Sequence, residues 1–559
     1  MTAAEILTDL IQIQKNCLNE IFNYNQPLNL KNNLHYRDWK VLVFDKFGEQ
    51  LITPIFSVKE LRDCGITLYL NVWDDKESIP DVSAIYFCRA TPENIQSIER
   101  DIRRKTYPRF YLNFIDSIDR SSLEKIAIAS LQSDCHSNIV SIYEQYSLFV
   151  PLFERFFCTD VQTSENFSLN GHNIKKEPCS NPPPKSEISD EIIDSIISAV
   201  ISIGQCPWII ARNQPFSSEL ASKLNSKLQD YINNPVQKSV FINDLYPDNH
   251  LMVYILERSA NYLPLMLHSW NYSDLINDCF GLSLNKVTLE RDKGDSEKHR
   301  SISLLPSDDF WRDGHLLVLF DANEQISSKM SKYRQEDEAL KNLNSNLKSS
   351  EYLDIDKIRM SMCFICIHHK NLNKASLDRI YNTIHNLQFS SCVRFFVDEM
   401  MHDSYKTVSK KAVANNEAAS NEISFANFSS NLNLPSFSKF FTEKIYNNVN
   451  KYIPSQVQCQ TVEELNQILK CNQASALLSR DFLSDFQINH PKVDQSDAAS
   501  VFKQDVDNCK TIIVYVVGGG SFYEYQNIHE NFKNKNIKVI YGCSSVYNFE
   551  QMIEEIDQR

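Results

Sequence analysis

Glycine is scarce in this sequence, with 11 residues in 559. Three of them are consecutive, at Gly518–Gly520, and they follow a β-branched run at 511–517. Such a run predicts a buried strand, and the glycines allow the sharp exit that phosphate-binding turns also use. A P-loop needs Lys and then Ser or Thr after its last Gly, and a dinucleotide turn needs a further Gly at a fixed offset. Residues 521–524 are Ser, Phe, Tyr and Glu, which would crowd and repel a pyrophosphate. A nucleotide-binding enzyme that uses this turn is therefore kept only as an alternative.

A long apolar segment is also missing. The best candidate, 192–210, is interrupted by polar and helix-breaking residues. Its apolar residues recur at the spacing of a helix that packs on a core. The 15 cysteines are odd in number and scattered, and no signal peptide precedes them, which fits a reducing cytosol. We therefore expect a cytoplasmic protein that reaches membranes only through its partners.

An excess of positive charge and recognisable catalytic motifs are lacking as well. The net charge of −14 argues against nucleic acids and anionic membranes as general partners. The sequence has no G-x-S-x-G elbow and no protease-type cysteine signature. Cys363 and Cys366, followed by His368 and His369, have no second ligand pair, so a buried helix explains them better than a zinc site. We expect no catalytic residue, no metal and no cofactor.

The order of apolar segments predicts the first domain. The hydrophobic content of 42% is ample for packed cores, and the length predicts about three to four domains. After an amphipathic helix within 1–22, unbroken apolar runs alternate with helix-sized segments; the runs are 41–44, 66–70, 84–88 and 110–114. This alternation predicts a parallel sheet buried on both faces, and hence an α/β domain at 1–150.

A second α/β pattern follows a polar linker near 160–190. It consists of helices at 189–203 and 216–232 and strands at 208–211 and 251–256. These strands are too few for a full sheet, and those near 512–517 and 538–541 can complete it. We therefore expect a discontinuous α/β domain at 151–250 and 481–559. The stretch between its two parts, 251–480, is expected to be mainly helical.

Two segments have compositions suited to binding. The helix expected at 121–130 and the segment 138–146 carry six apolar or small residues: Leu123, Ile126, Ala127, Ile139, Ile142 and Tyr143. The small Ala127 leaves room for one aromatic side chain, although from residue types alone core packing is the simpler interpretation. The segment 324–347 has heptad-like spacing, which predicts an amphipathic helix; the residues at that spacing are Ile326, Met330, Tyr333, Leu340 and Leu343.

Several short motifs occur in the order and spacing of one known family. They lie at 39–45, 79–87, 91–95, 111–115, 307–311, 356–359, 516–527 and 539–544. Through them the chain resembles the SM (Sec/Munc) family of SNARE-binding proteins, and the match is closest to the Sly-type members of endoplasmic reticulum–Golgi transport. The chain departs from the family pattern at Glu257 and Asn261, where Asp is usual, and matches poorly over 400–500.

The resemblance implies a fold and two binding sites. The implied fold is a three-domain arch: two parallel-sheet α/β domains, the second discontinuous, and a large, mainly helical insertion. The six residues of segments 121–130 and 138–146 would form a pocket for the N-terminal peptide of a syntaxin, with a Phe inserted. The 324–347 segment would guide SNARE helices into register.

The resemblance also implies a function. We expect a non-enzymatic chaperone that binds a syntaxin-type SNARE, a vesicle SNARE and the assembled SNARE bundle. It would promote SNARE assembly in vesicle docking and fusion, recruited peripherally to endoplasmic reticulum and Golgi membranes. An SM protein of the plasma membrane or the vacuole is an alternative, and so is a tether or coat adaptor with the same fold.

Overall fold

The computed structural model describes most of the chain outside its centre. The described residues are 9–26, 38–159, 185–234, 250–267, 271–283, 285–290, 299–305, 308–318, 321–328, 459–471 and 483–548, with a few single positions. The chain forms two compact units, one of residues 1–317 and 457–559 and one of residues 318–456. The first unit contains both large sheets.

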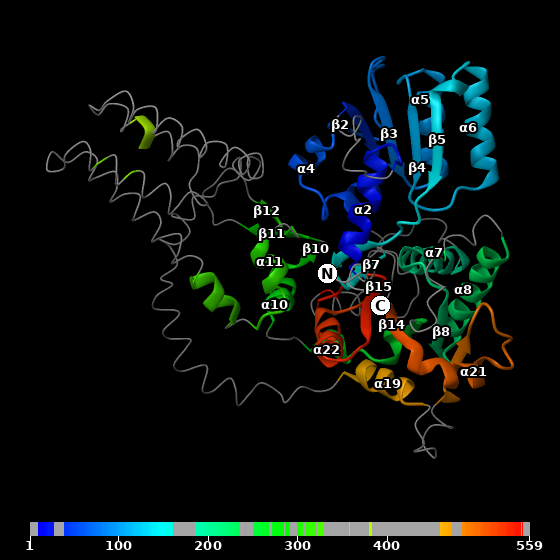
Figure 1. Ribbon diagram of the computed structural model, residues 1–559, viewed down its shortest axis with the longest axis vertical. Coiled ribbons are helices and arrows are strands. Elements are labelled where there is room, and N and C mark those ends of the chain that lie inside the picture. Colours follow the sequence, from blue (N-terminus) through cyan, green and yellow to red (C-terminus); the bar gives the residue numbers. More distant parts are fainter. Residues whose placement is uncertain are drawn as a thin grey trace. The chain divides into compact units, whose positions relative to one another are not determined.

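The first sheet has five strands in the order β2-β1-β3-β4-β5 (Figure 1). They are β1 (Lys40–Phe44), β2 (Ile66–Asn71), β3 (Ser83–Cys88), β4 (Phe110–Phe114) and β5 (Ile139–Glu144). All neighbouring pairs are parallel, so the expected parallel α/β domain is confirmed. Each of β2 and β5 pairs with a single neighbour among the described strands, so β5 forms an edge of the sheet.

Helices cover both faces of this sheet. One face packs against α3 (Lys46–Ile52), α4 (Val58–Asp63) and the C-terminal half of α2 (Leu10–Phe22); the other packs against α5 (Pro92–Arg103) and α6 (Arg120–Gln132). The local sequence sets where these helices begin. Thr91 caps α5 directly before a Pro at the first helical position, and the Asp119 side chain accepts from the backbone N–H of Ser122 in α6.

The second sheet has seven strands in the order β13-β8-β9-β14-β15-β7-β6. They are β6 (Val150–Phe153), β7 (Phe156–Cys158), β8 (Pro207–Arg212), β9 (His250–Glu257), β13 (Phe486–Asn489), β14 (Cys509–Val517) and β15 (Lys538–Cys543). Segments far apart in the sequence therefore share one sheet, as predicted. The sheet is mixed: its central pairs are parallel, and its two edge strands, β13 and β6, pair antiparallel with their neighbours. The β6–β7 connection is a tight hairpin, and such a short loop can join only antiparallel strands.

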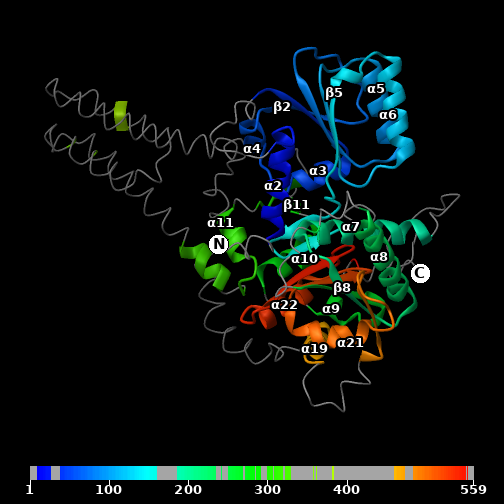
Figure 2. The same ribbon diagram turned by 45° about the vertical axis from the view of Figure 1, so that its right-hand side comes forward.

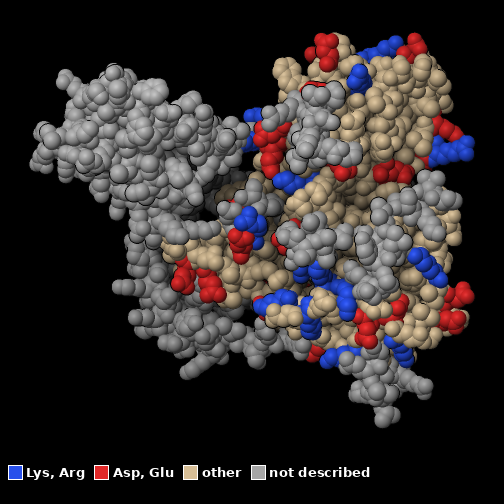
Figure 3. Space-filling view, in the orientation of Figure 1, with Lys and Arg blue, Asp and Glu red and all other residues tan. Residues whose placement is uncertain are grey.

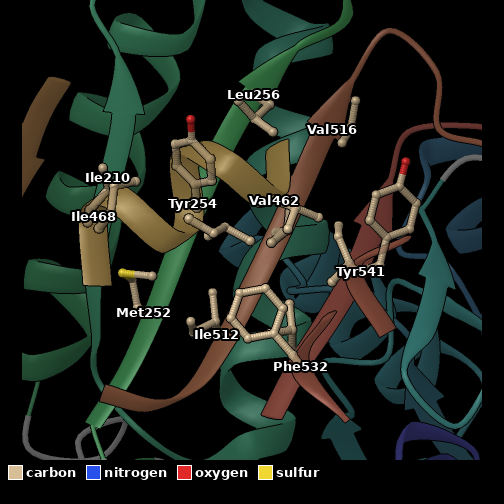
Figure 4. Close-up of a cluster of buried hydrophobic side chains, with 14 of the residues drawn as sticks. Ile210, Met252, Tyr254, Leu256, Val462, Ile468, Ile512, Val516, Phe532 and Tyr541 are labelled. Atoms are coloured by element: carbon tan, nitrogen blue, oxygen red, sulfur yellow. The ribbon is translucent and has the colours of Figure 1, made fainter. Parts of the chain in front are cut away.

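Two hydrophobic cores enclose the second sheet. One face packs against α7 (Lys185–Ile203) and α8 (Pro215–Asn233), and the other against α19 (Gln460–Leu469), α21 (Ala498–Asp505) and α22 (Phe522–Phe532). Figure 4 shows Val462 and Ile468 of α19 among the side chains of the strands. The predicted division places α19 in the helical insertion, yet α19 completes this core, and β9 runs across the boundary at 250. The division into three domains stays a prediction.

Two of the crossover connections of the second sheet have opposite hands. Both β8–α8–β9 and β14–α22–β15 step in the same direction along the sheet between parallel neighbours. However, α8 and α22 lie on opposite faces. One of the two connections is therefore left-handed, whereas about 98% of such connections are right-handed.

Smaller elements complete the described chain (Figure 2). They are the helices α9 (Leu263–Met266), α10 (Tyr272–Phe280) and α11 (Asp309–Gly314), the strands β10 (Leu282–Ser283), β11 (Lys286–Glu290) and β12 (His299–Ser303), and the 3-10 turns η1 (His136–Asn138), η5 (Arg258–Ala260) and η8 (Val506–Asn508). β10, β11 and β12 form a small antiparallel sheet within the stretch that was expected to be mainly helical. In the second unit, residues 321–328 are helical.

Candidate functional site

Exposed apolar side chains gather on α6 and β5. Among the residues that the structure describes, thirteen large hydrophobic side chains are exposed, and five of them lie on these two neighbouring elements. The five are Ile128, Leu131, Val140, Ile142 and Tyr143. Apolar side chains that share one face of these elements mark an interaction site more often than single exposed residues do.

β5 presents both backbone and side-chain groups at the edge of the first sheet. Gln145 N donates to Phe114 O of β4 at 2.8 Å. Because successive residues of a strand direct their backbone groups to opposite edges, the N–H and C=O of Ile142 point away from β4. The side chain of Ile142 is in register with Leu112, which places it on the face that carries α5 and α6. It is 37% exposed.

One side of α6, which is apolar, also faces the edge of the sheet at β5. Ile126 and Ala129 pack into the core of the first sheet, and Gln132 accepts a hydrogen bond from Arg103 of α5 at 2.9 Å. With about 100° between successive residues of a helix, Leu123, Ala127 and Leu131 lie on the flank that faces away from α5. That flank lies on the side of the edge strand β5. We call the apolar surface formed by Leu123, Ala127, Leu131 and Ile142 the α6–β5 surface.

The six predicted residues are only partly brought together. Leu123, Ala127 and Ile142 share the α6–β5 surface. Ile126 is 1% exposed and belongs to the core, as does the partly buried Ile139. Tyr143 is exposed but in register with Asn113, so it lies on the opposite face of β5. A charge placed at Ile126 would test the core and not the surface. The binding role of these residues stays a prediction.

Sequence reasoning missed Leu131, which is 68% exposed. Helical spacing could have found it, because it follows Ala127 by four residues and therefore lies on the same flank. It also missed Val140, which stands at the irregularity where the register of β4 and β5 shifts. Such an irregularity has no clear signal in the residues themselves.

Carboxylates lie at one end of the α6–β5 surface. Hydrogen bonds from the hydroxyls of Ser121 and Ser122 hold the pKa of Asp119 below its usual range. Glu144, the last residue of β5, accepts from the backbone N–H of Ile118 at 2.9 Å. Elsewhere on the face drawn in Figure 3, residues of both signs lie interspersed. The start of α6 also carries Arg120, which is paired with Glu124 at 2.9 Å, so charges of both signs lie at this end of the surface.

The second predicted site lies mostly outside the described residues. Ile326 belongs to the helical stretch 321–328 and is half-buried. Met330, Tyr333, Leu340 and Leu343 fall outside the described part of the chain, and so do Cys363, Cys366, His368 and His369. The guiding role of the 324–347 segment stays a prediction.

The Gly518–Gly520 turn is filled by protein groups. Gly518 N donates to Ser544 Oγ at 3.0 Å, and Gly520 N donates to Ser545 O at 2.7 Å. A Cβ on Gly519 would lie 2.2 Å from the ring of Tyr547. A phosphate-binding turn needs free N–H groups and open space for the anion. These contacts therefore count against the nucleotide-binding alternative.

Among the residues that the structure describes, none of the helices combines the length and the apolar composition that a membrane span requires. Within the same part of the chain, no group of three or more His, Cys, Asp or Glu side chains is arranged to hold a metal ion.

The chain is similar to one family of known proteins over nearly its whole length. The chain matches the model of the Sec1 family over residues 40–355 and 343–555. It is 25% identical over 641 residues to Sec1 family domain-containing protein 1 of Rattus norvegicus, which covers 100% of this chain and 99% of the relative. It is 23% identical to the protein sly1 homolog of Drosophila melanogaster, with 93% of each chain covered.

A solved structure confirms the fold. The crystal structure of Sly1p in complex with an N-terminal peptide of Sed5p matches with a TM-score of 0.66 and 20% identity, over 99% of this chain and 98% of that one. The α/β fold expected from the sequence motifs is thus that of known SM proteins. Because the family model covers most of the sequence, this chain belongs to the Sec1 family.

Proposed function

We propose that this protein is a non-enzymatic SNARE-binding chaperone. It captures the N-terminal peptide of a syntaxin-type SNARE on the α6–β5 surface and promotes SNARE assembly in endoplasmic reticulum–Golgi transport. The observation that carries the proposal is the apolar surface next to an edge strand, in a fold whose match Sly1p carries an N-terminal peptide of Sed5p. Relatives named Sly1 favour the endoplasmic reticulum–Golgi step.

The chemistry of the α6–β5 surface suits a short peptide with one apolar anchor. Ala127 has almost no side chain, and Leu123, Leu131 and Ile142 surround it with apolar groups, so a large side chain can lie there and lose contact with water. The outward N–H and C=O of Ile142 can pair with an extended peptide backbone.

Capture of the peptide would assist assembly through proximity. A tethered syntaxin has a high effective concentration near the rest of the protein, which lowers the entropic cost of bringing SNARE helices together. In this proposal the 324–347 segment of the second unit aligns a vesicle SNARE, because heptad spacing matches the coiled coils that SNAREs form. The protein would need no cofactor, and its partners would recruit it to the membrane from the cytoplasm.

We expect Ala127→Arg and Ile142→Arg to weaken peptide binding strongly without unfolding the protein. Each places a charge on the α6–β5 surface, and the loss of a central anchor site is worth about 2 kcal/mol or more, or roughly 30-fold in Kd. The measurement is a fluorescence anisotropy titration with labelled N-terminal peptides of endoplasmic reticulum–Golgi, plasma-membrane and vacuolar syntaxins. The melting temperature of each variant is recorded alongside.

Ile128→Arg is the matched control. Ile128 is 51% exposed on the same helix but is turned away from β5. The variant should therefore bind the peptide with the same Kd as the wild type. Equal binding by wild type, Ala127→Arg and Ile142→Arg would place the peptide site elsewhere. Preference for a plasma-membrane or vacuolar peptide would assign the protein to another branch of the family. Binding to none of the peptides would contradict the proposed function.

A further inference from the structure

The two elements of the α6–β5 surface are joined by one carboxylate. Glu144 Oε1 accepts from Ile118 N at 2.9 Å, just before the cap of α6, and Glu144 Oε2 accepts from the hydroxyl of Tyr146 at 2.7 Å. Glu144 is the last residue of β5. Its side chain therefore restrains the distance between the start of α6 and the end of β5. The same carboxylate is hydrogen-bonded to Tyr146, so a change at Tyr146 can alter that distance.

Tyr146 connects this point to the second sheet. Its φ of 46° lies in the left-handed region, which a bulky residue rarely adopts. Its ring meets that of Tyr231 on α8 edge to face, with centroids 5.8 Å apart. Tyr146 also lies in the short connection between β5 of the first sheet and β6 of the second. The unusual backbone is thus held from both sides, by Glu144 and by Tyr231.

A second set of contacts joins the loop between β4 and α6, which contains Ile118, to α7. Asp116 follows β4 and precedes α6 by four residues. It accepts from Ala90 N at 2.7 Å and from Arg89 Nε at 3.3 Å. Arg89 Nη1 in turn donates to Glu191 of α7 at 2.6 Å. The loop that positions α6 is therefore attached to both helices, α7 and α8, on one face of the second sheet.

We propose that Glu144 and Asp116 are positioning residues that couple capture of the peptide on the α6–β5 surface to the contacts that α7 and α8 make with Arg89 and Tyr146. The proposal rests on the proposed function for its ligand. Two states of a protein are coupled to a ligand only if the ligand binds one of them better. In this proposal the two states differ in the spacing between α6 and β5, and the peptide binds one spacing better than the other. Because coupling is reciprocal, the peptide should in turn stabilise the contacts of Tyr231 and Glu191.

The test uses Tyr231→Ala and Glu191→Ala, which lie outside the α6–β5 surface. Hydrogen exchange of residues 118–132 and 139–144 is measured without peptide, and the Kd of the labelled syntaxin peptide is measured by anisotropy. We expect faster exchange in both segments and peptide binding weakened by about fivefold or more, the lower range of known couplings. Tyr146→Phe keeps the ring but removes the hydroxyl that hydrogen-bonds Glu144 and Tyr231, so it should speed exchange in the same two segments.

Glu219→Ala is the matched control, because Glu219 is an exposed residue of α8 whose ion pair with Lys223 stays within the helix. It should change neither readout. Unchanged exchange and unchanged affinity in Tyr231→Ala and Glu191→Ala would overturn the proposal even if the wild type binds peptide. A wild type that binds no peptide would overturn the proposed function instead, and the exchange measurement would still decide whether the two sets of contacts position α6 and β5.

Discussion

Replacing Arg258 by Met is expected to lower the free energy of unfolding by about 3–5 kcal/mol, the cost of leaving one member of a buried ion pair without its partner. The side chains of Arg258 and Glu524 are 3% and 1% exposed, and Arg258 Nη2 contacts Glu524 Oε2 directly. Arg258 Nε also donates to Gly519 O at 2.7 Å. Glu524 further accepts from Thr461 Oγ1 at 2.5 Å and from the Tyr541 hydroxyl at 2.7 Å. One buried pair thus joins η5, α19, α22 and β15.

Urea unfolding of Arg258→Met, Glu524→Leu and the double variant checks this expectation. The double variant should lose less than the sum of the single losses, because neither charge is then left alone. Arg120→Met is the control: its partner Glu124 forms an exposed pair, which is worth at most about 1 kcal/mol. Single losses as small as that of the control would contradict the expected role of the buried pair.

The pH dependence of stability gives an independent check on the same pair. Burial by itself would raise the pKa of Glu524, but Arg258 and the hydroxyls of Thr461 and Tyr541 more than offset this, so the pKa lies below 4.5. The stabilising contribution of Glu524 is therefore present above about pH 4.5 and is lost as the pH falls through the lowered pKa. In Arg258→Met the pKa of Glu524 should rise, because burial is no longer opposed. The stability difference between wild type and variant should then shrink in acid.

Gly519→Ala is expected to destabilise the protein by roughly 2–6 kcal/mol, the sum of about 1–3 for overpacking and about 1–3 for a left-handed backbone. Its φ is 109°, and its Cβ would lie 2.2 Å and 2.6 Å from two ring atoms of Tyr547. That ring is 6% exposed and packs against Leu265, so it has little space in which to move. Thermal and urea unfolding would measure the loss.

Gly281→Ala separates the two contributions. Gly281 also has a left-handed φ, of 68°, but nothing lies within 4 Å of an added Cβ. The free energy of unfolding of Gly281→Ala should therefore fall only by the cost of the left-handed backbone, about 1–3 kcal/mol. The second-site change Tyr547→Leu should recover part of the loss in Gly519→Ala, since it removes the ring. Equal losses at Gly519 and Gly281 would show that steric crowding at the turn is unimportant.

The α6–β5 surface shows how much of a binding site can be predicted from residue types alone. The sequence predicts the helix and the apolar segment after it, because runs, caps and spacing are local properties. It groups Ile126 with Ala127 since both are small or apolar. The structure separates them: Ile126 enters the core, and Ala127 lies outside. A rotation of about 100° between neighbouring helical residues decides this, and only packing against the sheet sets which direction is inward.

By itself the sequence determined the parallel first sheet, the discontinuous second sheet and membership of the family. These depend on the order of apolar runs, on helix caps and on short motifs. Only the tertiary structure decided that α19 completes the core of the second sheet, that two edge strands run antiparallel, and that Glu524 after the glycine turn pairs with Arg258. The physical reason is the same in each case. Residues distant in the chain are brought into contact by packing and strand register. A local sequence pattern does not specify which distant segment will pack against it.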